Sequence, residues 1–254
     1  MNILTVKFGD KYPSSYVNDI YDWVQINERT LTTSRFEKPW VEVYCYTDDP
    51  TGLNPDINII PIEDGLEGVW HKLAMFQKDF GGIKGKIMYM DLDVVVQRDI
   101  SGLYYIHNEF TMVKCYWKPI EELYKEDPKY SRFADDYHIK TDMNINSSVM
   151  IWNQNENVHI WEHFLQDPEY HMHKYLGIDR FLYWEELTNN FFSEGTIYSR
   201  NFGIDAINGW YKPWSQPYFK ENGFICLLNG NTTEKDRLEL LNDINNYRER
   251  TLSI

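Results

Sequence analysis

The sequence predicts one α/β domain in which helices flank a mostly parallel central sheet. An apolar run at residues 87–96 is broken only by Asp91 and Asp93, and such runs are typical of strands buried on both faces. Strands alternate with helices before this run, which favours parallel strands joined by right-handed crossovers. The 254 residues contain no linker-like or repeated stretch, so we expect a single domain over 1–254.

In the first half of the chain, turn residues separate apolar strands from amphipathic helices. Apolar side chains recur at helical spacing over residues 14–29, where Ser14 or Ser15 supplies a cap. Gly81 and Gly82 end the next helical segment. The expected elements are strand 2–8, helix 14–29, strand 40–46, strand 57–61, helix 69–80 and a strand that ends at Met90.

The second half is less regular, but it still alternates between strand and helix patterns. Short apolar segments rich in β-branched or aromatic residues indicate strands, and helical spacing indicates the rest. The expected elements are strand 110–115, strand 147–152, helix 159–165, helix 179–188, a late strand over 223–230 and a polar closing helix over 234–250.

Asp91 and Asp93 form the most informative pair in the chain. An unpaired carboxylate is costly inside a buried strand, so we expect the strand to end at Met90. Alternation along an extended backbone points both aspartates the same way and Leu92 the opposite way. Ligands bind at this carboxyl edge in open α/β sheets, and two oxygen ligands suit Mg2+ or Mn2+ beside a phosphate. A solvated turn is the alternative, and the following valine run favours the site.

Composition narrows the partners and the compartment. A net charge of −14 argues against duplex nucleic acid and against an anionic membrane surface. The 19 Tyr, 13 Phe and 9 Trp suit either sugar stacking or an ordinary core. Cys45, Cys115 and Cys226 lie far apart and indicate free thiols in a reducing compartment. Without a signal-like or membrane-spanning apolar segment, we expect a cytoplasmic protein.

Four segments, in their order along the chain, resemble nucleotide-sugar glycosyltransferases of the GT-A fold, close to the glycogenin and bacterial galactosyltransferase group. They are residues 5–12, 70–76, 91–93 and 143–152, and the likeness in motif order covers most of the chain. The resemblance implies a Rossmann-like GT-A domain, with a nucleotide-binding half over 1–100 and an acceptor-side half over 101–254.

The resemblance also implies roles for individual residues. In the first segment, Phe8 and Tyr12 would contact the donor, with Tyr12 stacked on the nucleotide base. An apolar anchor for the following helix is the alternative for Tyr12. Lys72 would meet the donor diphosphate or sugar, unless it is a surface lysine. Asp91 and Asp93 would bind the metal ion.

The fourth segment and two later positions complete the implied site. Asn146, Ser147 and Ser148 would line the sugar pocket, although a polar turn before a strand has the same composition. Asp179 would lie near the reacting sugar carbon, with a helix N-cap as the alternative. Asn229 would act as a third metal ligand.

The chain departs from the family pattern around these positions. Arg180 stands where a glutamine is usual, and Asn229 stands where a histidine is usual. An amide oxygen still ligates Mg2+ or Mn2+, though more weakly than imidazole binds Mn2+. Residues 230–232 lack the usual Gly-Lys-Pro, and residues 212–214 contain a similar Lys-Pro-Trp tripeptide. These departures put catalytic competence in question while leaving donor binding plausible.

The implied function is metal-dependent transfer of a sugar from a nucleotide-diphosphate donor, by resemblance a UDP-sugar, to a hydroxyl of a glycan, lipid or protein. Retention at the sugar carbon follows by analogy alone. One alternative is a degenerate protein that binds nucleotide-sugars without turnover. The other is a haloacid-dehalogenase-type phosphatase, in which 135–136 would imitate the late acidic pair, although there the Asp-x-Asp normally follows the first strand.

Two further groups of side chains invite interpretation. His159, His163, His171 and His173 could suggest zinc, with the first two one helical turn apart. No cysteine lies near them, so we expect surface histidines or core histidines with ordinary partners. The aromatic residues of a candidate acceptor platform are Trp210, Tyr211, Trp214 and Tyr218.

Overall fold

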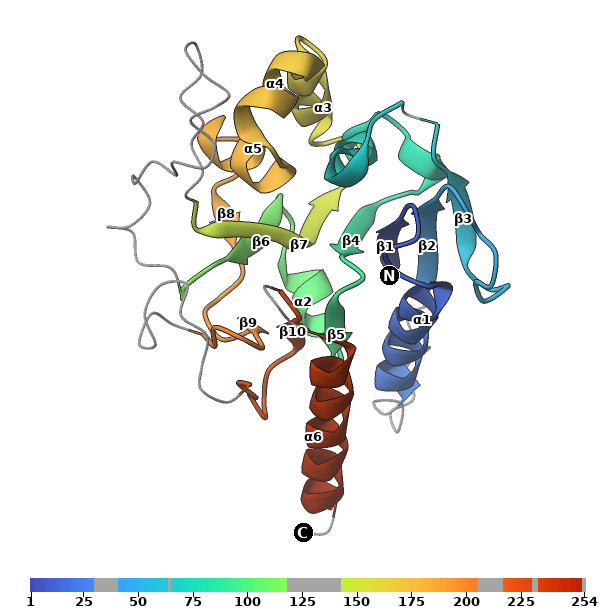
Figure 1. The fold of residues 1–254 in the computed structure, drawn as a ribbon, viewed down its shortest axis with the longest axis vertical. Coiled ribbons are helices and arrows are strands. Elements are labelled where there is room, and N and C mark those ends of the chain that lie inside the picture. Colours follow the sequence, from blue (N-terminus) through green and yellow to red (C-terminus); the bar gives the residue numbers. More distant parts are fainter. Residues whose placement is uncertain (30–40, 64, 118–142, 205–216, 230–232, 253–254) are drawn as a thin grey trace.

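The computed structural model describes residues 1–29, 41–63, 65–117, 143–204, 217–229 and 233–252. Among these residues, a seven-stranded sheet has the order β3-β2-β1-β4-β7-β6-β8, and a smaller sheet has the order β5-β10-β9. Figure 1 shows α3, α4 and α5 grouped at one end of the molecule and α6 at the other. The predicted α/β class with a mostly parallel central sheet is confirmed.

The first half of the chain builds the parallel part of the large sheet. Its strands are β1 (Asn2–Lys7), β2 (Glu42–Thr47), β3 (Asn58–Pro61) and β4 (Lys86–Met90). Each pairs in parallel with its neighbours in the order β3-β2-β1-β4. The strand before the two aspartates therefore ends at Met90, as the sequence predicts, because the apolar run would otherwise bury the carboxylates.

The second half adds antiparallel strands to the same sheet. β7 (Ile145–Asn153) runs antiparallel to both β4 and β6 (Thr111–Lys114). The short β8 (Asn190–Phe191) then pairs in parallel with β6. Because β7 lies beside β4, its polar beginning meets the carboxyl end of β4.

The valine run after the aspartates starts the second sheet. It forms β5 (Val94–Val96), which pairs antiparallel with β10 (Ile225–Leu227). β10 pairs in parallel with β9 (Ile197–Ser199). The predicted late strand over 223–230 is confirmed but is shorter than expected, and the three residues 91–93 connect one sheet to the other.

Six α-helices lie among the described residues. They are α1 (Ser14–Arg29), α2 (Ser101–Ile106), α3 (Val158–Phe164), α4 (Pro168–Tyr175), α5 (Ile178–Trp184) and α6 (Glu234–Leu252). The structure confirms the helices predicted near 14–29, 159–165, 179–188 and 234–250. Most of the observed helix ends agree with the predicted ends to within a few residues. The sequence did not indicate α2 or α4.

The predicted α-helix over 69–80 is wrong in type. The segment forms two 3₁₀ helices, η1 (Gly68–Phe76) and η2 (Phe80–Gly82). All seven side chains over 70–76 are buried, so this segment has no solvent-facing side of the kind that an amphipathic α-helix presents. Asp79, which lies between the two pieces, has a left-handed backbone with φ of 55°, and Gly81 inside η2 has φ of 56°.

The central strands of the large sheet are buried on both faces, because neighbouring residues of these strands enter different cores. Ile3 packs in a cluster that α1 covers through Val17 and Ile20. Leu4 packs in a second cluster against η1, α3 and α5. The small sheet divides in the same way, since Val95 packs with side chains of α6 whereas its neighbours Val94 and Val96 join the first cluster.

Cys45, Cys115 and Cys226 are buried free thiols, as the sequence predicts. No described helix combines the length and the apolar character that crossing a membrane requires.

We expect Ile151→Ala to destabilise the fold by about 2–5 kcal/mol, because it opens a cavity in the centre of β7. Ile151 is fully buried, whereas Ile106 on α2 is 73% exposed. Urea unfolding of both variants measures the difference. Ile106→Ala is the matched control and should change stability by at most about 0.5 kcal/mol. Equal effects would contradict the assignment of Ile151 to the core.

Candidate functional site

The backbone of residues 91–93 is attached to both sheets. The Asp91 amide donates to the Ser148 carbonyl at 2.8 Å, which holds the start of the connection against β7. The Asp93 carbonyl accepts from the Leu228 amide at 2.8 Å, which holds its end beside β10. Both aspartate side chains are partly buried, so the two carboxylates have a fixed position at the carboxyl edge of β4.

Lys72 on η1 is the cation of this site. Its Nζ lies 2.7 and 2.8 Å from the two carboxylate oxygens of Asp91 and 3.4 Å from Ser147 Oγ. Lys72 is only 9% exposed, so the alternative of a surface lysine is wrong. Burial opposes its charge, but the nearby carboxylates, chiefly Asp91, outweigh burial and raise the pKa of the lysine.

Tyr89 is a residue of this site that the sequence reasoning missed. Its hydroxyl donates a hydrogen bond to Asp91, and it is fully buried. Burial, followed by the charge of Asp91, raises its pKa well above the ordinary value. Alternation along β4 could have indicated this contact, because Tyr89 and Asp91 are two residues apart and share a face.

Asp93 is the less compensated carboxylate of the pair. Its Oδ2 accepts from the Tyr12 hydroxyl at 3.3 Å. Desolvation and the charge of Asp91 together raise its pKa to about 6, although Lys72 and Lys11 act in the opposite direction. The site therefore carries negative charge that the described side chains do not fully offset.

Tyr12 connects this carboxylate to the first helix. Its ring lies 5.2 Å from the ring of Tyr16 on α1, centroid to centroid, while its hydroxyl bonds to Asp93. The anchoring alternative is therefore supported by the ring contact. The predicted stacking on a nucleotide base stays a prediction. Phe8 packs against His71, with ring centroids 5.2 Å apart, next to Lys72 in the chain.

The start of β7 brings Asp179 to the same place. The Ser147 amide donates to Asp179 Oδ1 at 2.9 Å, and the Asp179 charge acts on Lys72. The N-cap of α5 is Gly177, so the N-cap alternative for Asp179 is wrong. Asp179 lies in the first turn and faces a neighbouring strand.

The remaining predicted residues lie around this centre. Asn146 Oδ1 accepts from the Ser148 amide at 2.9 Å, and Ser148 is buried. Asn229 follows Leu228, which bonds to the Asp93 carbonyl, and its Oδ1 accepts from Ser199 Oγ at 2.6 Å. Residues 135–136, 210–214 and 230–232 lie outside the described residues.

The oxygen atoms of this site are the kind of ligands that suit a hard divalent cation. Asp91, Asp93 and Asp179 supply three carboxylates around one buried ammonium group, and burial followed by repulsion from Asp91 raises the pKa of Asp93. Carboxylate and amide oxygens are the ligands that Mg2+ and Mn2+ prefer. Asp91 and Asp93 carry carboxylates of this kind, and Asn229, whose Oδ1 accepts from Ser199 Oγ, stays a predicted third ligand.

Solved structures that are similar to this chain include the following three. Galactosyltransferase LgtC in complex with donor and acceptor sugar analogues is 12% identical, with a TM-score of 0.55, over 91% of this chain and 88% of that chain. An active-site mutant of LgtC is 12% identical, with a TM-score of 0.57, over 96% of each chain. The glycosyltransferase GlyE of Streptococcus pneumoniae TIGR4 is 10% identical, with a TM-score of 0.49, over 78% of this chain and 47% of that chain.

No protein-family model matches the sequence, and no curated protein matches it. The likeness to LgtC at 12% identity therefore establishes the fold. The predicted GT-A architecture is confirmed at this level.

We expect Asp93→Asn to change how stability depends on pH in metal-free protein. The folded-state pKa of about 6 exceeds the ordinary value of 3.8, so wild-type protein loses stability as pH rises from about 4 through 6. Asparagine at position 93 does not titrate, so the variant does not lose this stability as the pH rises. Relative to wild type, the variant should therefore gain on the order of 2 kcal/mol between pH 4 and pH 8.

Urea unfolding in the presence of a chelator measures this change at both pH values. Asp10→Asn, an exposed aspartate of the β1–α1 turn, controls for the loss of one surface charge. A constant difference between Asp93→Asn and wild type across this range would contradict the assignment of the raised pKa to Asp93.

Proposed function

We propose that this chain is a metal-dependent glycosyltransferase that moves a sugar from a nucleotide-diphosphate donor to an acceptor hydroxyl. One observation carries the proposal: Asp91, Asp93, Asp179 and Lys72 converge at the carboxyl edge of β4. The fold shared with LgtC, whose structure holds donor and acceptor sugar analogues, supports this reading. A UDP-sugar donor and retention follow from the family resemblance.

Asp91 and Asp93 would hold Mg2+ or Mn2+, with Asn229 as a third oxygen ligand. When bound, the cation would supply positive charge beside the diphosphate leaving group. Lys72 contacts both oxygens of Asp91, and we assign the same ammonium group to the donor diphosphate. Burial keeps these charges in a region of low dielectric constant, where each contact is stronger than in water.

Asp179 is the residue that we assign to the reacting sugar carbon. The Ser147 amide fixes one of its oxygens, and its charge acts on Lys72. A negative group held there would stabilise oxocarbenium-like charge on the sugar or attack it. Asn146 and Ser148 would contact sugar hydroxyls, and Phe8 and Tyr12 would contact the nucleoside.

Two substitutions relative to the family pattern favour a second function, which is binding of nucleotide-sugars without turnover. Asn229 and Arg180 replace the histidine and the glutamine of the family pattern, and Asn229 Oδ1 already accepts from Ser199. A protein that binds nucleotide-sugars without turnover is consistent with these changes. The phosphatase alternative finds no support, because three strands of the sheet precede β4 in the chain.

We expect one class of nucleotide-sugar to raise the melting temperature only when Mn2+ or Mg2+ is present. A ligand at about 100 times its Kd adds roughly 2.7 kcal/mol to the stability of the folded state. A thermal-shift screen of UDP-, GDP-, CMP- and dTDP-sugars, each with and without metal, measures this. Asp91→Asn and Asp93→Asn should abolish the metal-dependent shift while the fold persists.

Asp10→Asn serves again as the matched control and should retain the full shift. If either site variant binds donor and metal as wild type does, the metal assignment fails. No response to any nucleotide-sugar would overturn the proposed donor site itself.

We expect Asp179→Asn to keep donor binding but to lower turnover by about 10²–10³-fold, since it removes one electrostatic contact to the transition state. The amide oxygen of asparagine still accepts from the Ser147 amide, so local structure should persist. Release of nucleoside diphosphate during donor hydrolysis measures turnover, and the thermal shift reports binding. Binding without turnover in wild-type protein would favour the second function, and unchanged turnover in the variant would remove Asp179 from the mechanism.

A further inference from the structure

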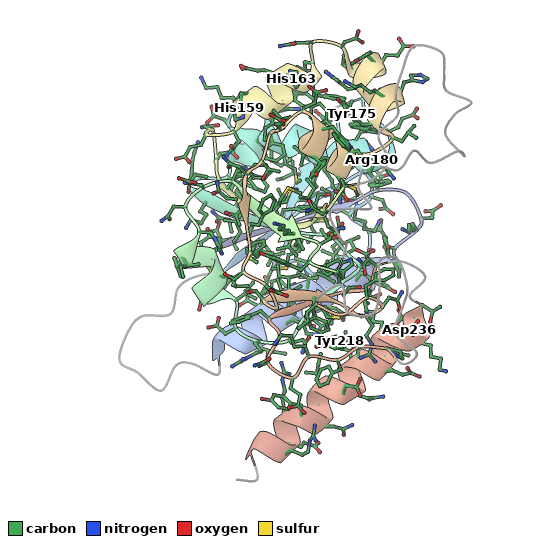
Figure 2. The ribbon with its side chains drawn as sticks, turned by 90° about the vertical axis from the view of Figure 1, so that its left-hand side faces the viewer. His159, His163, Tyr175, Arg180, Tyr218 and Asp236 are labelled. Atoms are coloured by element: carbon green, nitrogen blue, oxygen red, sulfur yellow. The ribbon has the colours of Figure 1, made fainter. Side chains whose placement is uncertain are left out.

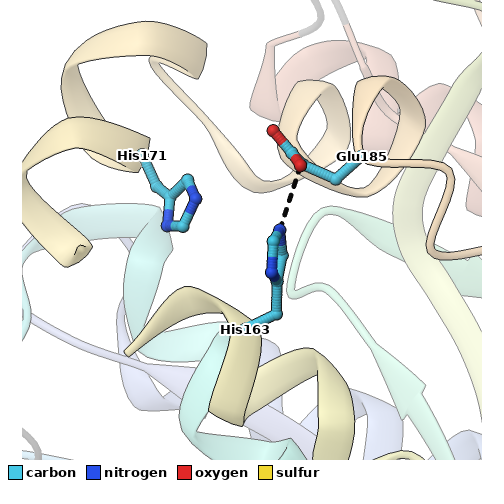
Figure 3. A group of neighbouring side chains, drawn as sticks. All are labelled: His163, His171 and Glu185. Carbon is cyan, nitrogen blue, oxygen red and sulfur yellow. Dashed lines mark hydrogen bonds and ion pairs between the residues drawn. The ribbon is translucent and has the colours of Figure 1, made fainter. Parts of the chain in front are cut away.

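Two histidines and one glutamate meet on three short helices, away from residues 91–93. His163 lies on α3, His171 on α4, and Glu185 caps the end of α5. Figure 2 places His163 at the end of the molecule opposite Tyr218 and Asp236. The possible ligand atoms of His163, His171 and Glu185 all lie within 4.8 Å of one another. Figure 3 shows these three side chains turned toward a common space.

Each of these side chains makes a hydrogen bond, and one of these bonds joins His163 to Glu185. His171 Nδ1 donates to the Phe164 carbonyl at 3.1 Å, so Nε2 is the basic nitrogen of that ring. His163 Nε2 lies 3.0 Å from Glu185 Oε2. The two imidazole rings are 5.1 Å apart, centroid to centroid.

Other side chains orient the carboxylate from outside the cluster. Glu185 Oε1 accepts from the Tyr175 hydroxyl and from Lys174 Nζ, the latter at 3.3 Å. These contacts direct Oε2 toward His163. Metal-binding histidines usually donate their second ring N–H to a carbonyl or carboxylate, and metal-binding carboxylates are themselves hydrogen-bonded. His171 and Glu185 both show this arrangement.

We propose that His163, His171 and Glu185 form a Zn2+ site that fastens α3, α4 and the end of α5 to one another. Two imidazoles and one carboxylate make a ligand set that suits zinc, with a fourth position open to water. A tetrahedral ion with bonds of about 2.0–2.1 Å separates its ligands by roughly 3.4 Å. The His163–Glu185 contact of 3.0 Å is already near this spacing, and because all the ligand atoms lie within 4.8 Å of one another, loading requires any pair to close by at most about 1.4 Å.

The protonation states of the cluster agree with a metal site. Burial lowers the pKa of His171, so that ring is neutral at pH 7, as a ligand must be. Burial opposes the charge of Glu185, but hydrogen bonds from Tyr175, His163 and Lys174 outweigh it and lower its pKa to about 2. The His163 side chain is 31% exposed, which gives an ion a path from solvent.

The site is chemically distinct from the cation site at Asp91 and Asp93. Oxygen ligands there favour Mg2+ or Mn2+, whereas imidazole nitrogens here favour zinc. It also bears on the active region, because Glu185 ends the helix whose first turn holds Asp179. A zinc ion would fix that helix at one end while the Ser147 amide holds it at the other.

Zinc retention by the whole chain tests this inference. Protein stripped by a chelator would be loaded with Zn2+, dialysed, and analysed for zinc by mass spectrometry. An Asp91→Asn background removes metal bound at residues 91–93, and failure of donor binding in the earlier screen does not affect the result. We expect one zinc per chain, and at least a tenfold loss of Zn2+ affinity in His163→Gln and in His171→Gln.

Two histidines on the same helices provide matched controls. His159 on α3 and His173 on α4 are exposed, and His159→Gln and His173→Gln should retain one zinc per chain. Absence of zinc from the parent protein, or equal retention in all four variants, would overturn the site. Circular dichroism checks that each variant is folded.

If either ligand variant fails to fold, Co2+ loading of the parent protein decides the question. Visible absorption of four-coordinate Co2+ that one equivalent of Zn2+ abolishes supports the site. The weak spectrum of six-coordinate Co2+ overturns it, because the cluster then holds no metal in the proposed geometry.

Discussion

The connection at residues 91–93 is the constraint on which the rest of this structure depends. Three residues link the central sheet to the small sheet, and hydrogen bonds to the Ser148 carbonyl and from the Leu228 amide hold the two ends of the link. Leu92, between the two aspartates, is buried. Rotation of this backbone would therefore pull the Leu92 side chain out of the hydrophobic core. The carboxylates before and after it are consequently held in place by the packing of both sheets.

Charge balance at this connection explains why its neighbours are polar but buried. Lys72 is almost fully buried because it offsets Asp91, and Tyr89 donates to the same carboxylate. Buried charges persist only when they are paired and hydrogen-bonded. The Asp93 carboxylate accepts from the Tyr12 hydroxyl at 3.3 Å. Burial and the charge of Asp91 outweigh this bond and raise the pKa of Asp93, so an added cation would be favourable here.

The antiparallel β7 brings the second half of the chain to this site. Its pairing with β4 places Ser147 and Ser148 beside Asp91, and Ser147 in turn holds Asp179 at the start of α5. The helices α3, α4 and α5 pack on η1 and on one another through aromatic rings, with Trp70 stacked on Phe164 at 5.6 Å. Displacement of these helices would therefore move both Lys72 and Asp179.

The sequence by itself determined the class of fold, the order of most elements, the end of β4 and the shared direction of Asp91 and Asp93. These features follow from local rules: apolar runs mark buried strands, and side chains alternate along them. The 3₁₀ form of η1 was not predictable from spacing, because burial on all sides comes from α3 and α5, which lie far away in the sequence.

Only the tertiary structure decided which polar residues meet. Lys72, Ser147 and Asp179 are separated along the chain by 75 and 32 residues, and no local pattern specifies that they converge. The same holds for His163, His171 and Glu185: the sequence predicted surface or core histidines with ordinary partners, and only the packing of α3, α4 and α5 brings these three side chains together. Pairing between distant strands and helices places these groups, and it depends on the whole core, not on any one segment.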